Sequence, residues 1–212
     1  GRNDSSTLTG NKGTAQIVIN LEGLETTTEE MMKVDGAVVT LPEGEYTLPS
    51  DLGDSVTIEG AEGANVVINA PNAANLKSND VTFRNVTINK SNSNYNGFQH
   101  SNVMNYEDCV INNQIFLYGQ NETFTRCTFN QTSANAYNVW TYGARNVTFN
   151  ECTFNSAGKS VLVYTESKIN STVTFNDCVL NASAPVEGKA AVEVDSSLIK
   201  DGHYTVVFNN TT

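Results

Sequence analysis

A repeated unit of seven to nine residues constrains this chain more than any other feature of its sequence. Each copy has alternating apolar residues around a central aromatic residue and ends in Asn. Five copies occur, at residues 81–89, 106–112, 124–130, 147–155 and 173–181. The steps between their aromatic residues are 23, 18, 25 and 26 residues. A constant unit with variable spacing indicates a solenoid whose coils carry loop insertions.

Two weaker copies extend the series at both ends. Residues 56–58 lie 25 residues before Phe83, and residues 206–208 lie 33 residues after Phe175. The seven copies predict about seven coils. A length of 212 residues, 39% of them apolar, suits a single domain with one continuous core.

The apolar residues within one copy change parity. Val147 and Phe149 alternate, whereas Cys152 and Phe154 alternate in the opposite parity. Because successive side chains of a strand point to opposite faces, both pairs face one core only if the chain bends at residues 150–151. A third strand precedes the bend in successive coils, at residues 115–118, 139–142, 161–164 and 192–195. Three short strands per coil predict a parallel β-helix, whereas the consensus of leucine-rich repeats and the apolar period of helical repeats are missing.

The repeated unit, with residues 38–48 (Val-Val-Thr-Leu-Pro-Glu-Gly-Glu-Tyr-Thr-Leu) as an entry coil, resembles the pectate-lyase-like family of β-helices. The similarity covers roughly residues 36–212 and is closest to secreted or surface lipoproteins of Gram-negative gut bacteria. It implies an all-β, right-handed, single-stranded parallel β-helix with an extracytoplasmic location. No catalytic motif of the family maps onto this chain. The family's lyases use a basic residue with Ca²⁺ or Arg, but Arg occurs only at positions 2, 84, 126 and 145, and no run of Asp suits a calcium site. We therefore expect neither a metal nor another cofactor.

The first 35 residues are expected to form a tail and a cap, followed by the β-helix at residues 36–212. Residues 16–21 read as a strand, and Thr27 and Glu30 have the spacing of a capping box before Met31 and Met32. We expect residues 14–35 to cover the open end of the core. The abrupt start also leads us to expect that an export signal was removed, with a lipid anchor on the full-length protein.

The charge balance excludes one class of partner. Lys and Arg number 12 against 23 Asp and Glu, a net charge of −11, which opposes binding to nucleic acid. No run of 18 apolar residues is present, so no transmembrane segment is expected. We expect a monomer.

Two ladders of identical residues should run along the coils. Cys109, Cys127, Cys152 and Cys178 take the same inward place in successive copies, and their spacing gives no metal cluster. We expect buried free thiols, with disulfides as the alternative because neighbouring coils lie within disulfide range. A terminal Asn in each copy should form an amide ladder and take left-handed backbone geometry. Its members are Asn89, Asn112, Asn130, Asn155 and Asn181.

The strand at residues 192–195 predicts an aromatic surface. Glu193 and Asp195 cannot both be buried without partners, so Val192 and Val194 should point inward. The same register turns one column of Phe116, Trp140 and Leu162, and a second of Tyr118, Tyr142 and Tyr164, towards solvent. The preceding coil would add Phe98 and His100. Exposed aromatic rows suggest sugar stacking, with simple sheet stabilisation or a protein interface as the alternatives.

Carboxylates near this surface make an enzymatic function an alternative. Glu166, Glu193 and Asp195 are weak catalytic candidates, because residues two apart on one strand face place their carboxylates near the separation used by inverting glycosidases. We expect a secreted or surface-anchored β-helix that binds glycan or another surface ligand without catalysis. The ligand surface would be Phe116, Tyr118, Trp140, Tyr142 and Tyr164. A glycoside hydrolase, less strongly a polysaccharide lyase, and a structural or adhesive module are the alternatives.

Overall fold

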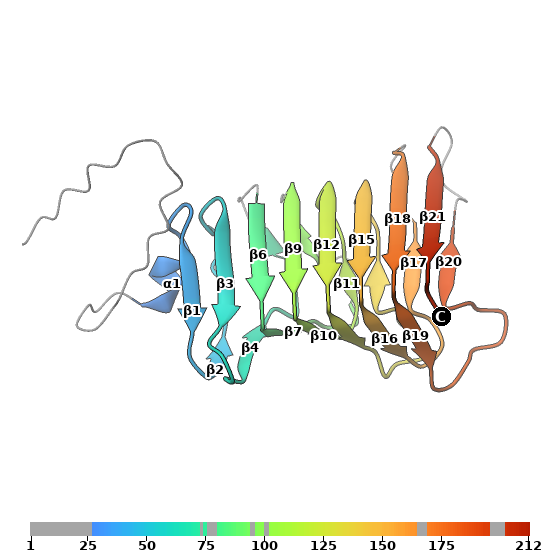
Figure 1. Cartoon of the computed structure of the whole chain (residues 1–212), viewed down its shortest axis with the longest axis horizontal. Coiled ribbons are helices and arrows are strands. Elements are labelled where there is room, and N and C mark those ends of the chain that lie inside the picture. The colour runs from blue at the N-terminus through green and yellow to red at the C-terminus, as the bar shows by residue number, and fades with distance from the viewer. Residues whose placement is uncertain are drawn as a thin grey trace, which may run out of the picture.

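The chain winds into a parallel β-helix whose coils stack along the long axis of the molecule (Figure 1). The computed structural model describes residues 27–72, 74–75, 80–93, 96–99, 102–164, 169–195 and 202–212. Strands of neighbouring coils pair in parallel and in register, as Phe124, Phe149 and Phe175 do. The all-β solenoid expected from the repeat is therefore confirmed.

The first strand of each repeated unit lies in an eight-stranded sheet. It holds the seven copies found in the sequence and the entry strand β1. In spatial order its strands are β1 (Val38–Leu41), β3 (Val56–Gly60), β6 (Asp80–Arg84), β9 (Val103–Glu107), β12 (Asn121–Thr125), β15 (Asn146–Asn150), β18 (Ser171–Asn176) and β21 (Tyr204–Asn209).

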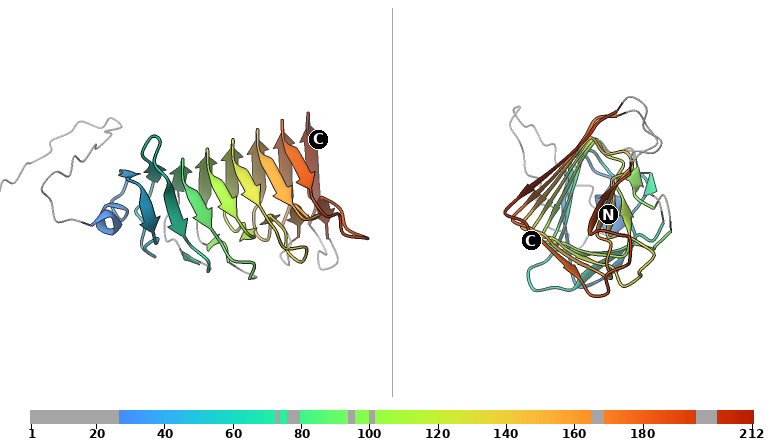
Figure 2. Two further views of the ribbon diagram at one scale, coloured as in Figure 1. Left: turned by 90° about the horizontal axis from the view of Figure 1, so that it is seen from below. Right: turned by 90° about the vertical axis from the view of Figure 1, so that its right-hand side faces the viewer.

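Two further sheets complete the coil, and the view along the axis shows a triangular outline (Figure 2). A seven-stranded sheet contains β2 (Gly44–Tyr46), β4 (Val66–Asn69), β7 (Thr87–Asn89), β10 (Val110–Asn112), β13 (Thr128–Asn130), β16 (Thr153–Ser156) and β19 (Val179–Ala182). A four-stranded sheet contains β11 (Ile115–Phe116), β14 (Val139–Trp140), β17 (Val161–Val163) and β20 (Val192–Val194). In an earlier part of the chain, β5 (Ala74–Asn75) pairs with β8 (Phe98–Gln99).

The bend between the first two sheets uses the left-handed backbone region. Glu151, the corner between β15 and β16, has φ of 53°. The same place in other coils also has positive φ, at Asn85, Asp108, Arg126, Asp177 and Asn210. The expected bend at residues 150–151 is confirmed. The expectation of left-handed geometry at the Asn ladder is wrong, because those Asn residues lie in strands. The left-handed residues lie instead at the bend between the first two sheets.

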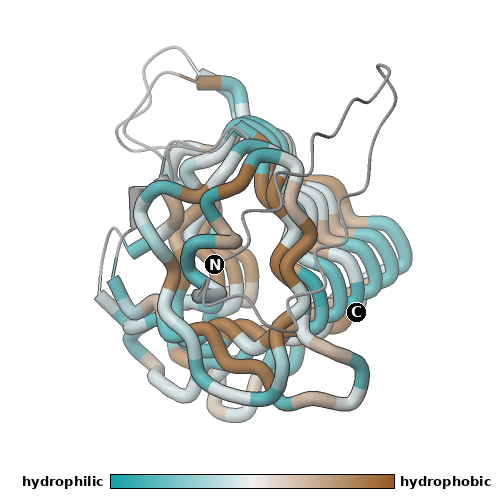
Figure 3. The backbone as a smooth tube through the Cα atoms, turned by 90° about the vertical axis from the view of Figure 1, so that its left-hand side faces the viewer, coloured by the Kyte–Doolittle hydropathy of each residue, from teal (hydrophilic) through white to brown (hydrophobic). Residues whose placement is uncertain are grey.

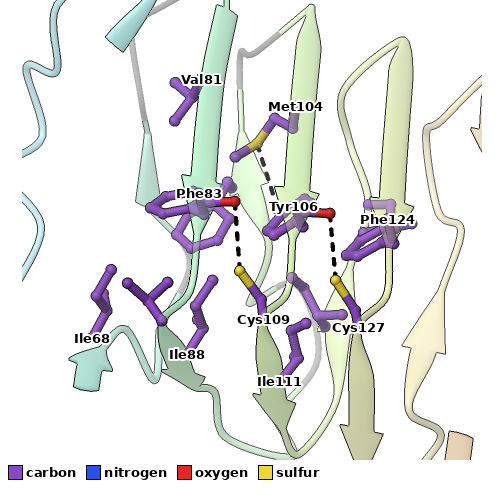
Figure 4. Packing of buried hydrophobic residues seen from close by; sticks show 14 of the residues in the cluster. Ile68, Val81, Phe83, Ile88, Met104, Tyr106, Cys109, Ile111, Phe124 and Cys127 are labelled. Atoms are coloured by element: carbon purple, nitrogen blue, oxygen red, sulfur yellow. Dashed lines mark hydrogen bonds between the residues drawn. The ribbon is translucent and has the colours of Figure 1, made fainter. Parts of the chain in front are cut away.

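A column of stacked aromatic rings fills the core (Figure 4). Tyr106 and Phe124 lie 4.2 Å apart between ring centroids, and Phe124, Phe149 and Phe175 continue the stack at 5.2 and 5.1 Å. Hydrophobic stretches alternate with hydrophilic ones along the coils, and hydrophilic residues of successive coils stack at one edge (Figure 3). The core is therefore continuous through the coils, as the alternating pattern predicts.

The cysteine and asparagine ladders are both present. All four Cys are free and buried. Each Sγ donates to a carbonyl of the preceding coil, for example from Cys109 to Phe83 at 3.5 Å (Figure 4). The Asn side chains donate from coil to coil at 2.9 to 3.1 Å, from Asn181 through Asn155, Asn130, Asn112 and Asn89 to Asn69.

A short helix covers the N-terminal end of the coil stack. In α1 (Thr28–Met31), the N-cap residue Thr27 accepts a hydrogen bond from the Glu30 backbone N–H at 3.3 Å, as the capping pattern predicts. Met32 is buried in the core, and its carbonyl accepts a hydrogen bond from the Gly53 backbone. The strand expected at residues 16–21 lies outside the described residues.

Candidate functional site

The outer face of the four-stranded sheet carries the predicted aromatic column. Phe116, Trp140, Leu162 and Glu193 are paired in register in successive strands. Their neighbours Ile115, Val139 and Val161, from the same strands, are fully buried in the core. The register that places aliphatic residues inside and this column outside is therefore confirmed.

The expectation that both columns face solvent is wrong for part of the surface. Phe116 is only 1% exposed and Leu162 only 9%. The Trp140 ring lies 4.5 Å from the Phe116 ring, and the rings of Tyr142 and Tyr118 lie 5.7 and 6.1 Å from it. Tyr118 of the same coil and Trp140 and Tyr142 of the next coil therefore cover Phe116.

Four rings of this aromatic face remain half-buried and reach the surface: Tyr118, Trp140, Tyr142 and Tyr164. Trp140 and Tyr164 meet edge to face at 5.5 Å, and Tyr118 and Tyr142 do so at 5.6 Å. The Trp140 indole Nε1 donates to the Tyr164 carbonyl at 3.3 Å. These contacts fix the orientation of the rings before any ligand arrives.

The preceding coil does not extend the aromatic face as expected. Phe98 is 1% exposed and stacks on the core ring of Phe83 at 5.5 Å. It pairs with the inward Leu117 rather than with Phe116, a one-residue difference that reverses the direction of its side chain. His100 and Glu166, the other residues expected near this surface, lie outside the described residues.

Glu193 lies at the C-terminal edge of the aromatic face and is half-buried. Its carboxylate accepts a hydrogen bond from the Tyr137 hydroxyl and forms an ion pair with Lys189 Nζ at 3.4 Å. Burial, and then the charge of Asp195, raises the pKa of Glu193. Asp195, two residues later, is exposed. The two carboxylates thus have different environments, although Asp195 directly follows the strand that contains Glu193.

Tyr137 belongs to the site but was not found by sequence reasoning. It lies in the loop between β13 and β14, 56 residues before Glu193. Buried glutamines hold the loop, because Gln114 Oε1 accepts from the Tyr137 backbone N–H at 2.9 Å and Gln131 Nε2 donates to its carbonyl at 2.9 Å. Lys159 Nζ lies 4.8 Å from the centre of its ring. No sequence spacing signals this contact, since it joins a loop to a distant strand.

A groove of about 360 Å³ lies beside the end of the Asn ladder. Most of its lining residues carry amides or hydroxyls, but carbon atoms make up the larger part of its exposed wall. The lining residues are Asn130, Gln131, Thr132, Asn155, Ser156, Asn181, Ala182 and Ser183. Gln131 also contacts the loop that carries Tyr137, so the groove and the aromatic face share one supporting segment.

Two Arg residues that could neutralise an acidic substrate are engaged elsewhere. Arg84 forms ion pairs with Glu59 and Glu107, on the eight-stranded sheet. Arg126 Nε lies 2.8 Å from Oδ1 of Asp108, which occupies the same corner in the preceding coil. Within the described ranges, no group of three or more His, Cys, Asp or Glu residues is arranged to hold a metal ion. The chemistry of this face is therefore that of aromatic rings, hydroxyls and a carboxylate.

Comparisons with known proteins identify no relative. No family model matches the chain, and neither the curated proteins nor the solved structures contain a match. None of the described helices is long and apolar enough to cross a membrane.

Proposed function

We propose that the aromatic face binds a neutral polysaccharide without turning it over. The main observation behind this proposal is a set of three half-buried rings, Trp140, Tyr142 and Tyr164. They come from two adjacent coils and contact one another. Aromatic rings stack on the apolar faces of sugars. Adjacent coils repeat every ~4.8 Å, close to the length of a sugar unit, so successive units can meet successive coils.

The surrounding charges favour a neutral ligand over an acidic one. The chain has a net charge of −11, and Glu193 and Asp195 lie at one end of the face. Uronate polymers would meet repulsion there, whereas sugar hydroxyls can donate to carboxylates. The ammonium group of Lys189 is already ion-paired with Glu193.

A glycan array followed by titration of Trp140→Ala tests the proposal. The parent protein should bind at least one neutral glycan, and Trp140→Ala should weaken that binding at least about tenfold while the thermal unfolding transition is retained. Tyr142→Ala provides a second variant if Trp140→Ala does not fold. Tyr46→Ala is the matched control, because Tyr46 is a half-buried aromatic residue of the entry coil whose hydroxyl donates to the Pro42 carbonyl. Binding unaffected by both Trp140→Ala and Tyr142→Ala would disprove the aromatic face as the site.

A glycoside hydrolase is the second candidate, favoured by the environment of Glu193. A carboxyl group whose pKa is raised by burial suits a general acid, and an exposed carboxylate such as Asp195 suits a base. Glu193→Gln combined with Asp195→Asn separates the two functions. Loss of turnover with retained affinity would support the hydrolase. A parent protein that binds glycan but releases no product across a broad panel would support the binder.

We also propose a secreted or surface-anchored location. The repeated unit and the entry coil at residues 38–48 support this, through their resemblance to pectate-lyase-like surface lipoproteins. Protease treatment of intact cells that produce the protein should remove it, and lipase-sensitive partitioning into detergent would reveal a lipid anchor. If no glycan binds, the remaining role is that of a structural or adhesive module.

A further inference from the structure

The groove beside the Asn ladder is formed by connections of unequal length. The coil that contains β16 passes to the four-stranded sheet through residues 157–160. The coils on either side of it have longer connections to that sheet, at residues 131–138 and 183–191. The lining of the groove comes from the end of β16 and from the beginnings of both longer connections. A short connection between two long ones therefore leaves a recess that extends over three successive coils.

Both walls of the groove are held by hydrogen bonds. In one wall, Gln131 Nε2 donates to the Tyr137 carbonyl at 2.9 Å, and Gln131 Oε1 accepts from the Ser133 backbone N–H at 3.0 Å. In the other wall, the backbone N–H and the hydroxyl of Ser183 donate to the Ser156 carbonyl at 2.9 and 3.1 Å. A ligand that enters a groove with fixed walls loses little free energy in ordering them.

The ladder amides in the groove can make further hydrogen bonds. Asn155 lies on the outer face of its strand, because its neighbour Phe154 points into the core. Asn155 Nδ2 donates to Asn130 Oδ1, and Asn155 Oδ1 accepts from Asn181 Nδ2, each at 3.1 Å. A primary amide has two N–H donors and two carbonyl lone pairs. The ladder uses one of each, so the second N–H and the second lone pair can serve a ligand.

The lining of the groove favours an uncharged ligand that carries hydroxyl groups. None of the lining residues has an ionisable side chain, so a charged ligand would lose its water without meeting an opposite charge. Carbon atoms form most of the exposed wall, so the ligand must also present C–H surface. A sugar ring combines C–H surface with hydroxyls that both donate and accept. The volume of about 360 Å³ is within the range of about 300 to 1,000 Å³ that is typical of small-molecule sites.

We propose that this groove is a second carbohydrate site, which binds a neutral sugar through the side-chain amides of Asn130, Asn155 and Asn181. It lies on the seven-stranded sheet, whereas the aromatic face lies on the four-stranded sheet. The two sites share no ligand-contacting residue, so sugar binding in the groove does not require the aromatic face.

NMR of the asparagine side-chain amides tests the proposal. Protein labelled with ¹⁵N-asparagine is titrated with neutral oligosaccharides of glucose, mannose, galactose and xylose. At least one of them should shift the side-chain signals of Asn155, with a dissociation constant below about 10 mM. The signals that disappear in Asn155→Ala identify this residue. The same substitution should weaken binding, followed on the signals of Asn130 and Asn181, at least about tenfold, because it removes both amide contacts.

Asn89→Ala is the matched control, because Asn89 takes the same place in the ladder outside the groove. Its Nδ2 donates to Asn69 Oδ1 at 3.1 Å, and its Oδ1 accepts from Asn112 Nδ2 at 2.9 Å. Asn89→Ala thus loses the same number of ladder bonds but should bind like the parent. If Asn155→Ala does not fold, Thr132→Leu should weaken binding by narrowing the groove from an exposed wall position. Circular dichroism establishes that each variant folds.

Trp140→Ala distinguishes the groove from the aromatic face. It should leave the response of Asn155 to the sugar unchanged, whether or not the aromatic face binds a glycan. A response that disappears in Trp140→Ala would overturn the second site, as would equal weakening by Asn89→Ala and Asn155→Ala. The absence of any shift at Asn155 with the whole sugar panel would also overturn it. So would shifts caused by a neutral Gly-Ser peptide but by no sugar, which would assign the groove to peptides.

Discussion

Glu122 in β12 and Val147 in β15 are paired in register, and both side chains point into the core. Glu122 is only 2% exposed, and its Oε2 has no hydrogen-bond partner among the described residues. Burial raises the pKa of Glu122 well above its usual range, and a hydrogen bond from the Gly119 backbone offsets only part of this effect. A carboxyl group thus occupies a place where the neighbouring coils have Val or Met.

Replacing Glu122 by Val should stabilise the protein most at high pH. Because the folded pKa is raised, the folded protein holds its proton more tightly than the unfolded chain. The stability that this pKa difference contributes is fully present below the unfolded pKa of about 4.3. It is lost as pH rises towards the folded pKa. We expect Glu122→Val to increase the free energy of unfolding at pH 8 by about 1 to 3 kcal/mol and to flatten its dependence on pH. Urea unfolding at several pH values measures this, with Glu62→Gln, an exposed glutamate, as the control.

Lys90 should make the free energy of unfolding depend on pH in the opposite direction, and at higher pH. It is 2% exposed, its Nζ donates to the Asn72 carbonyl at 3.1 Å, and burial lowers its pKa to about 7. Between the unfolded value near 10.4 and about 7, the unfolded chain binds a proton that the folded protein does not. Stability should therefore decrease as pH falls through this window and level off below it. Lys90→Met should remove the slope between pH 10 and 7, and a slope that persists in this variant would contradict the assignment.

The core could be predicted from the sequence because a period of two fixes which side chains face inward. Five similar copies give the same register, so Phe149 and Cys152 were assigned to one core with only the bend left to infer. Glu122 could have been found by the same alignment. The segment 121–124, Asn-Glu-Thr-Phe, matches 146–149, Asn-Val-Thr-Phe, and places Glu122 where Val147 is buried.

The surface was predicted less well, for a physical reason. The direction of Phe116 follows from strand register, but its exposure depends on how Trp140 and Tyr142 fold across it from the next coil. Phe98 lies in a two-residue strand, which carries no alternation to fix its register. The contact between Tyr137 and Glu193 joins a loop to a distant strand, so no local pattern encodes it.

Truncating the middle of the aromatic stack should cost far more than truncating its end. Phe149 is fully buried and contacts rings on both neighbouring coils. We expect Phe149→Ala to lower the free energy of unfolding by about 3 to 5 kcal/mol, through lost burial and the cavity that remains. Phe208→Ala is the control, because half of that ring is already exposed. Similar losses in both variants would argue against a continuous core.

The four thiols should be unreactive in the folded protein. Each sulfur is buried and lies within hydrogen-bond distance of two backbone carbonyls that can accept its single S–H, as Cys152 Sγ lies 3.4 Å from the oxygens of Phe124 and Asn150. A thiolate could not donate these bonds, and burial away from water disfavours the thiolate form. Labelling by a thiol reagent should be at least about 100-fold slower than in denaturant. Rapid labelling of two or more thiols would contradict this, and a mass that increases on reduction would reveal disulfides.

A substitution in the Asn ladder can separate the stability contributed by its hydrogen bonds from that contributed by its packing. Asn130 Nδ2 donates to Asn112 Oδ1, and Asn130 Oδ1 accepts from Asn155 Nδ2, each at 3.1 Å. Asn130→Asp keeps the shape and the acceptor but removes the donor, so a carboxylate would face the Asn112 oxygen. We expect a loss of about 1 to 2 kcal/mol at pH 7. Part of it should return below pH 4, where a protonated Asp can donate again. The same change at Asn181, the exposed last member, also removes one donated bond, but water can solvate the new carboxylate there, so it should cost less. Equal losses in the two variants, or no recovery of Asn130→Asp in acid, would show that the amide chain does not stabilise the coils.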